Sequence, residues 1–149
     1  MPHSQTLRHG RHSAQGQSYL LTTNTSQRQP IFADLHCARA LIRNMRRCTQ
    51  AGMLDSLAWV VMPDHLHWLI TLQTAQLHQL MRSLKAGTSM DLHRSGQHHG
   101  PVWQSGFHDH ALRREEDIRA IARYIVANPL RAGLCARVTD YPHWDAIWL

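Results

Sequence analysis

The sequence predicts an α+β fold in which helices pack on an antiparallel sheet. Short apolar or alternating runs, bounded by turn-forming residues, predict strands at 19–23, 57–62, 65–72 and 107–112. Apolar residues spaced three and four apart predict helices at 35–51, 77–93 and 115–128. The resulting order is β-α-β-β-α-β-α. Two helices that each return the chain to a small sheet are typical of a ferredoxin-like sandwich.

The first strand and the first helix are marked by residues at their ends. Residues 19–23 have the aromatic and β-branched character of a strand, and the polar stretch after them breaks it. Asp34 can cap the helix that follows, and Gly52 can end it. One side of this helix is apolar, with Leu35, Ala38, Leu41, Ile42 and Met45. The other side is basic, with Arg39, Arg43, Arg46 and Arg47.

Only Pro63 and Asp64 separate the second and third strands. Proline cannot donate a hydrogen bond to a sheet ladder, so this segment forms either a tight hairpin or one strand bent at the proline. The sequence leaves both alternatives open.

The last predicted helix, 115–128, begins with acidic residues, as the helix dipole favours. Its apolar residues recur with helical spacing and predict a stripe that packs on the core. They are Ile118, Ile121, Ala122 and Ile125. Tyr124 and Asn128 lie on one flank of this stripe, one helical turn apart.

The composition is that of one soluble globular domain. The chain has 149 residues, 43% of them hydrophobic and 17% charged, and we expect a single domain over 1–149 with an N-terminal arm at about 1–16 and a C-terminal tail at about 135–149. The first residues are charged and carry no apolar stretch, which predicts no secretory signal and a cytoplasmic protein. The cysteines Cys37, Cys48 and Cys135 are widely spaced, so we expect reduced packing residues.

The charge of the chain is basic, with a formal net charge of +6. Of its 16 basic residues only Lys85 is lysine. Arginine grips phosphate oxygens in pairs and stacks on bases, which favours a nucleic-acid partner. Composition alone is equally compatible with a GC-rich genome that encodes arginine in place of lysine.

His65 and His67 lie one residue apart in a predicted strand. Side chains alternate along a strand, so both imidazoles project from one face while Leu66 and Trp68 project from the other. Two imidazoles in this arrangement can share a metal ion. The pattern is weak by itself, because a chain with 13 histidines contains such pairs by chance.

Tyr124 and Asn128 extend this site if the helix that carries them lies beside the histidines. A tyrosine next to a metal is a nucleophile for covalent catalysis on a phosphodiester, and the amide oxygen of Asn128 could complete the metal site. The plainer alternatives are a tyrosine at the edge of the core and an asparagine that ends the helix before Pro129.

The chain resembles a known family in four successive segments, VVMPDHLHWLI, WQSGFHDHALR, RYIVANPLRAGL and YPHWDAIW. They are similar to the signatures of the REP-associated tyrosine transposases, relatives of the single-tyrosine transposases of small insertion sequences within the HUH endonuclease superfamily. The resemblance spans about residues 10–148. It implies a ferredoxin-like core, in agreement with the predicted order of elements.

The resemblance also implies roles for individual residues. His65 and His67 would be the metal-binding HUH motif, Tyr124 the catalytic nucleophile on a C-terminal helix, and Asn128 the third metal ligand. The cofactor implied is a divalent metal, Mg²⁺ or Mn²⁺, and a site with two imidazoles suits Mn²⁺ better.

The function implied is that of a metal-dependent endonuclease and strand transferase. Its substrate would be single-stranded DNA with REP-type hairpins, cleaved through a 5′-phosphotyrosine intermediate, and the enzyme would act as a monomer more readily than as a homodimer. The alternative is a domesticated protein that binds hairpin DNA or RNA and no longer cleaves. Joint retention of the histidines, Tyr124 and Asn128 speaks against it, and a cleavage assay separates the two.

Further candidates concern recognition and the surroundings of the metal site. The predicted DNA contacts are Arg8, Arg11, Arg39, Arg43, Arg46 and Arg47, each of which could equally be a solvated surface residue. Asp64 stands where many relatives have asparagine, and it either holds a metal-binding histidine in place or is a turn residue. His108 and His110 form a second pair with the same spacing, and only the resemblance selects the first.

Overall fold

The computed structural model describes residues 14–147, apart from the side chains of Glu115 and Glu116. Five strands form one sheet in the order β4-β1-β3-β2-β5, and all neighbouring strands are antiparallel. The strands are β1 (Ser18–Asn24), β2 (Leu54–Met62), β3 (His65–Leu72), β4 (His108–Leu112) and β5 (Trp144–Ala146). The helices are α2 (Leu35–Gln50), α3 (Leu77–Ser95), α4 (Glu115–Val126) and α5 (Asn128–Arg131). The predicted α+β sandwich with an antiparallel sheet is therefore confirmed.

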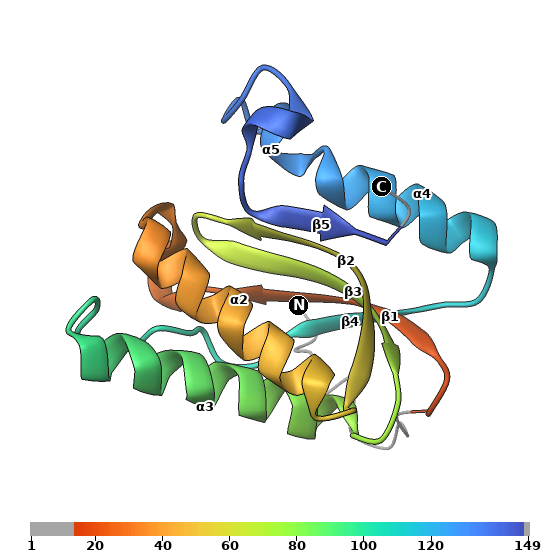
Figure 1. The fold of residues 1–149 in the computed structure, drawn as a ribbon, viewed down its shortest axis with the longest axis horizontal. Coiled ribbons are helices and arrows are strands. Elements are labelled where there is room, and N and C mark those ends of the chain that lie inside the picture. Colours follow the sequence, from red (N-terminus) through yellow and green to blue (C-terminus); the bar gives the residue numbers. More distant parts are fainter. Residues whose placement is uncertain (1–13, 148–149) are drawn as a thin grey trace.

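The two faces of the sheet are covered by different helices (Figure 1). α2 and α3 pack on one face, and their core includes the fully buried Phe32, Leu41 and Trp68. α4 packs on the other face, where Ile125 contacts a second apolar cluster that includes Leu69. Because side chains alternate along β3, this single strand contributes to both layers.

The segment 54–72 forms a tight hairpin, which settles the alternative left open above. Met62 pairs directly with His65, so Pro63 and Asp64 form a two-residue turn. Contacts from the loop after β1 hold the turn in place, since both the backbone N–H and the hydroxyl of Thr25 donate to the Asp64 carbonyl. The turn carries Asp64 directly beside His65.

The predicted helix ends agree closely with the structure. Asp34 caps α2, because its carboxylate accepts from the backbone N–H groups of His36 at 2.8 Å and Cys37 at 3.1 Å. The bond from Cys37 is the main reason that the pKa of Asp34 lies below its usual value. α3 ends before Gly96, which has the positive φ of 75° typical of a residue that follows a helix.

The C-terminal part differs from the prediction in two places. The helix predicted over 115–128 ends at Val126, and α5 begins after Ala127. Pro129 explains the break, because it has no N–H to bond to the carbonyl one turn earlier. The segment expected as a tail contains β5, which pairs with β2 at the sheet edge.

Some predicted segments lie outside the named strands or outside the described residues. Trp103, four residues before the predicted strand 107–112, forms an isolated bridge with Thr25 and lies outside the named strands. Most of the predicted N-terminal arm lies outside the described residues. None of the described helices combines the length and the apolar character needed to cross a membrane.

Candidate active site

His65 and His67 project from the same face of β3, as the strand period predicts. Leu66 and Trp68, the residues that alternate with them, are buried under α2 and α3. The two imidazole rings lie edge to face with their centroids 4.7 Å apart. The pair is therefore placed to bind one object on the α4 side of the sheet.

Each imidazole is held at its Nδ1 atom by a hydrogen-bond partner. The carboxylate of Asp64 lies 2.7 Å from Nδ1 of His65, and the hydroxyl of Thr22 on β1 lies 2.8 Å from Nδ1 of His67. Among the described residues none bonds to Nε2 of either ring. Metal-binding histidines are typically oriented in this way, with one nitrogen bonded to the protein and the other bound to the metal.

Asp64 is itself held by an arginine that the sequence did not single out. Arg28 binds the carboxylate with Nε at 3.0 Å and Nη2 at 2.9 Å. Partial burial raises the pKa of Asp64, but the bond with His65 and the charges of His65 and Arg28 outweigh it, so the pKa falls below its usual value. Asp64 thus lies in the hairpin turn and holds Nδ1 of His65.

The loop that presents Arg28 has an unusual backbone. Gln27 and Arg28 adopt positive φ angles of 53° and 55°, a conformation that side-chain-bearing residues rarely adopt. Each such residue costs on the order of 1 kcal/mol and persists only where surrounding contacts enforce it. Here the ion pair with Asp64 is such a contact.

His67 is neutral at physiological pH. Burial is the main cause that lowers its pKa to about 4, and the charges of His65, Arg131 and Arg28 act in the same direction. A neutral imidazole has the lone pair that a metal ligand needs.

Tyr124 differs from the other two tyrosines of the chain in its exposure. Tyr19 is buried, and the hydroxyl of Tyr141 donates to the carbonyl of Val61 at 2.7 Å. The side chain of Tyr124 projects from α4 with 57% of the residue exposed. It is therefore the tyrosine best able to reach a bound substrate.

Arg131 connects Tyr124 with the histidines, and sequence analysis missed it. Its guanidinium carbon lies 3.7 Å from the centre of the Tyr124 ring, and Nη2 donates to the Tyr124 carbonyl at 2.7 Å. After burial and the charge of His65, the same guanidinium also contributes to lowering the pKa of His67. Arg131 lies seven residues after Tyr124, about two helical turns, and the break between α4 and α5 falls between them.

Asn128 lies at the first position of α5, directly after the break. Its backbone carbonyl accepts from Ala132, and its side chain, partly exposed, has no hydrogen-bond partner among the described residues. Within the described part of the chain, no three His, Cys, Asp or Glu side chains gather as a metal site. A metal on the two histidines would therefore need an oxygen ligand of another kind, such as this amide.

The second histidine pair lies apart from the first. His108 on β4 pairs with Thr22, which in turn pairs with His67, so a whole strand separates the two imidazoles. The described residues include no cluster of three His, Cys, Asp or Glu side chains that could hold a metal, so His108 and His110 do not join His65 and His67 in one metal-binding group. His110 is exposed near the sheet edge.

The predicted DNA-binding arginines do not lie at the histidines. The four on α2 are exposed on the opposite side of the sheet, and Arg47 donates to Asn44 toward α3. Arg8 and Arg11 lie outside the described residues.

Trp103 packs on Phe32 with ring centroids 5.3 Å apart, which makes it part of the core edge.

Comparison with known proteins identifies the family. Residues 13–128 match the family described as IS200-like transposases. The chain belongs to the IS200-like transposase family. The matched region includes His65, His67, Tyr124 and Asn128, whereas Arg131 and β5 lie beyond it.

Individual relatives within the transposases agree with this. The REP-associated tyrosine transposase of Escherichia coli K12 is 33% identical over 87 residues, which are 57% of this chain and 50% of the relative. A Haemophilus influenzae protein with a related name is 28% identical over 100 residues, 60% of this chain and 57% of that protein. The chain thus spans about half the length of the curated relatives it matches.

Two solved structures share the fold. One is a REP-associated tyrosine transposase bound to a REP hairpin, 26% identical, with a TM-score of 0.76 over 90% of this chain and 79% of that one. A Deinococcus radiodurans structure, 21% identical with a TM-score of 0.55, covers 72% of this chain and 87% of its own and supports the fold alone. The resemblance of this transposase to the REP-associated group is confirmed.

Proposed function

We propose that this protein is a metal-dependent single-stranded DNA endonuclease and strand transferase that acts at REP-type hairpins. The observation that carries the proposal is the pair of imidazoles on one face of β3. Their Nδ1 atoms are held by Asp64 and Thr22, which orients both rings for a common ligand. The solved relative bound to a REP hairpin supports the choice of substrate class.

The donor set fits a divalent metal. His65 and His67 would hold it together with the amide oxygen of Asn128, and the low pKa of His67 keeps one imidazole neutral at pH 7. When bound, Mg²⁺ or Mn²⁺ would act as a Lewis acid that stabilises negative charge on the scissile phosphate. Asp64 would strengthen the site by holding Nδ1 of His65.

Tyr124 would be the nucleophile. Its hydroxyl oxygen attacks the phosphorus and loses its proton to water, and the 3′-oxygen leaves and takes up a proton. The products are a 5′-phosphotyrosine and a free 3′-hydroxyl. Because one ester bond forms for each that breaks, the reverse attack by a 3′-hydroxyl can rejoin strands without ATP.

The active site would be complete within one chain. Within one chain, Arg131 contacts the Tyr124 ring, and its charge is one of the causes that lower the pKa of His67. This supports a monomeric enzyme. Light scattering of the protein with and without hairpin DNA tests it, and a stable dimer that loses cleavage on dilution would contradict it.

The test of the proposed function is a cleavage assay with a matched tyrosine control. Purified protein is incubated with end-labelled single-stranded DNA from REP-type hairpins beside its own gene, in Mn²⁺, Mg²⁺ or EDTA. We expect a metal-dependent covalent adduct that Tyr124→Phe abolishes and Tyr141→Phe retains, since the Tyr141 hydroxyl bonds to Val61 inside the fold. Tight hairpin binding without an adduct in any metal would instead establish the domesticated binder.

A further inference from the structure

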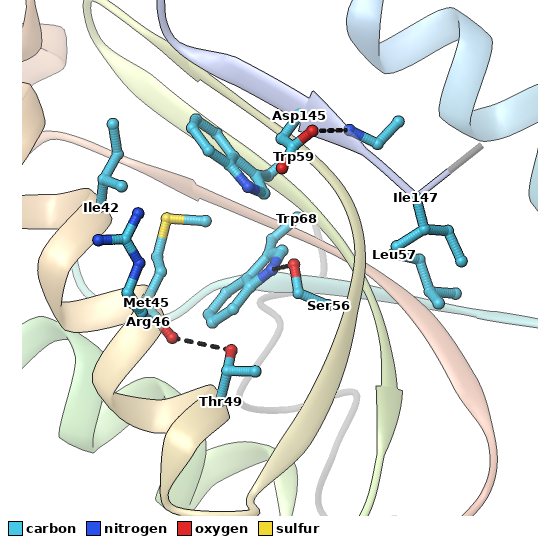
Figure 2. A pocket seen from close by; sticks show the side chains of 11 residues that line it. Ile42, Met45, Arg46, Thr49, Ser56, Leu57, Trp59, Trp68, Asp145 and Ile147 are labelled. Atoms are coloured by element: carbon cyan, nitrogen blue, oxygen red, sulfur yellow. Dashed lines mark hydrogen bonds between the residues drawn. The ribbon is translucent and has the colours of Figure 1, made fainter. Parts of the chain in front are cut away.

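A pocket lies between α2 and the edge formed by β2 and β5, across the sheet from the histidines. It encloses about 190 Å³ and is closed at its base by the buried side chains of Met45 and Trp68. Its polar lining includes Arg46 from α2, Trp59 from β2 and Asp145 from β5, beside Thr49 and Ser56 (Figure 2). The proposed cleavage mechanism uses none of these residues.

The wall combines a half-buried indole with a carboxylate. Trp59 and Asp145 are paired across β2 and β5, so their side chains lie next to each other on the same face of the sheet. Oδ1 of Asp145 accepts from the Ala146 N–H at 2.8 Å, which leaves Oδ2 as an acceptor. The indole of Trp68 behind them is already satisfied, because it donates to Ser56 at 2.9 Å.

The pocket has one basic lining residue, Arg46, and two further arginines precede it along α2. Arg39, Arg43 and Arg46 are spaced four and three residues apart and therefore lie along one side of α2. Burial is the main cause that lowers the pKa of His143, just before β5, and the charge of Arg39 acts in the same direction. The side chain of Arg46 has no ion-pair or hydrogen-bond partner among the side chains that the structure describes.

We propose that this pocket binds one unpaired nucleobase of single-stranded DNA. Trp59 stacks on the base, Asp145 accepts a hydrogen bond from its edge, and Arg46 contacts the adjoining phosphate, with Arg43 and Arg39 next along the strand. Aromatic platforms beside a basic track are the usual means of binding single strands. The inference rests on the proposed function, because it supplies a recognition site for the same substrate.

The volume of the pocket limits it to one base, and its carboxylate discriminates among the bases. Its volume is below the roughly 300–1,000 Å³ of pockets that enclose whole drug-sized ligands, so one ring system fits with sugar and phosphate outside. A carboxylate accepts from exocyclic amino groups, as it does from cytosine N4. Thymine has no exocyclic amino group. Its one N–H lies between two carbonyl oxygens, and a carboxylate repels these oxygens. We therefore expect cytosine, adenine or guanine in preference to thymine.

The test measures binding without cleavage. Labelled dC8, dA8 and dT8 and the REP-type hairpin are titrated by fluorescence anisotropy in EDTA against the Tyr124→Phe protein and against the same protein with a pocket substitution. Trp59→Leu should weaken dC8 binding about tenfold or more, since a stacked base contributes strongly to affinity. Trp59→Phe should restore most of it, and Asp145→Asn should reduce the preference for dC8 over dT8.

Arg46→Gln and Arg47→Gln form a matched pair with the same change in net charge. Arg46→Gln should weaken binding several-fold, whereas Arg47→Gln, which faces α3, should change it less than twofold. Equal losses would reduce the pocket to diffuse charge attraction and overturn the inference. Unchanged dC8 binding by Trp59→Leu would also overturn the inference. If Trp59→Leu unfolds at a lower temperature than the parent protein, the arginine pair and Asp145→Asn test the inference instead.

Failure of the inference and failure of the proposed function give different results. Wild type that cleaves hairpins while all pocket variants bind normally contradicts only the pocket. Wild type that never cleaves, but loses strand binding with Trp59→Leu and Arg46→Gln, contradicts only the enzyme. A parent protein that binds neither hairpin nor oligonucleotides contradicts both.

Discussion

The two faces of the sheet hold their polar residues in different ways. On the α4 face, His65 and His67 are partly buried, and each has a fixed partner at Nδ1. On the α2 face, the arginines of the helix are exposed; Arg47 donates to Asn44, and Arg46 lines the pocket at the β5 edge. The α4 face is therefore suited to binding a ligand in one fixed geometry, whereas the α2 face is suited to a flexible single strand of DNA.

This contrast shows how one thin sheet can separate chemistry from recognition. A buried and bonded imidazole keeps its position when a ligand arrives, so little reorganisation is needed at the reacting atoms. An exposed guanidinium keeps its rotamer freedom and adapts to successive phosphates. Substitution of one such side chain should therefore reduce activity much more on the α4 face than on the α2 face.

The largest effect is expected at the first histidine pair. His67→Gln should reduce metal-dependent adduct formation at least about a hundredfold, because the metal supplies several kcal/mol of charge stabilisation. His110→Gln, an exposed residue of the second pair, is the control and should change the rate less than twofold. A reversed order of the two variants would move the metal to the second pair.

A smaller loss is expected when the partner of His65 is removed. Asp64→Ala should raise the Mn²⁺ concentration for half-maximal cleavage about 10- to 100-fold, as outer-shell substitutions commonly do. Arg28→Gln should follow with a smaller shift, because it acts through Asp64. Asp55→Ala removes an exposed carboxylate of β2 and should leave Mn²⁺ binding unchanged. Isothermal titration with Mn²⁺ measures the same shift without cleavage.

Arg131 should affect the nucleophile more than substrate binding. Arg131→Gln removes the cation from the Tyr124 ring and should slow adduct formation about 3- to 20-fold, the range that such contacts support. The dissociation constant for hairpin DNA should stay within twofold. Arg137→Gln, which removes an exposed arginine paired with Asp140, serves as the control. A parallel loss of binding and rate would assign Arg131 to DNA contact.

The pH dependence of stability tests the burial of His67 without any substrate. Its pKa is about 4 in the folded protein and 6.5 in the unfolded chain, so between these values only the unfolded chain gains the proton. The free energy of unfolding in EDTA should therefore fall by about 2–3 kcal/mol as the pH drops from 7 to 4. Burial shifts the pKa of His143 the same way. Urea unfolding at each pH should show a shallower decline in His67→Gln, whereas an unchanged slope would contradict the burial of this imidazole.

Periodicity predicted the parts of the fold that depend on neighbouring residues. The alternation in 65–72 placed both histidines on one face, and the capping residue Asp34 marked the start of α2 correctly. It did not predict the break after Val126, because a proline at position 129 acts on a carbonyl one turn earlier. Nor did it predict β5, three residues that form a strand only because β2 offers them an edge.

The sequence by itself determined the order of β1 to β4 and of the three long helices, the common face of His65 and His67, and the resemblance that identified the transposase family. Only the tertiary structure decided what surrounds them. Thr22 reaches His67 across 45 residues of chain, and Arg28 reaches Asp64 across 36. Local patterns record which face a side chain occupies. They do not record its partner, because the partner is set by how strands register and how helices pack.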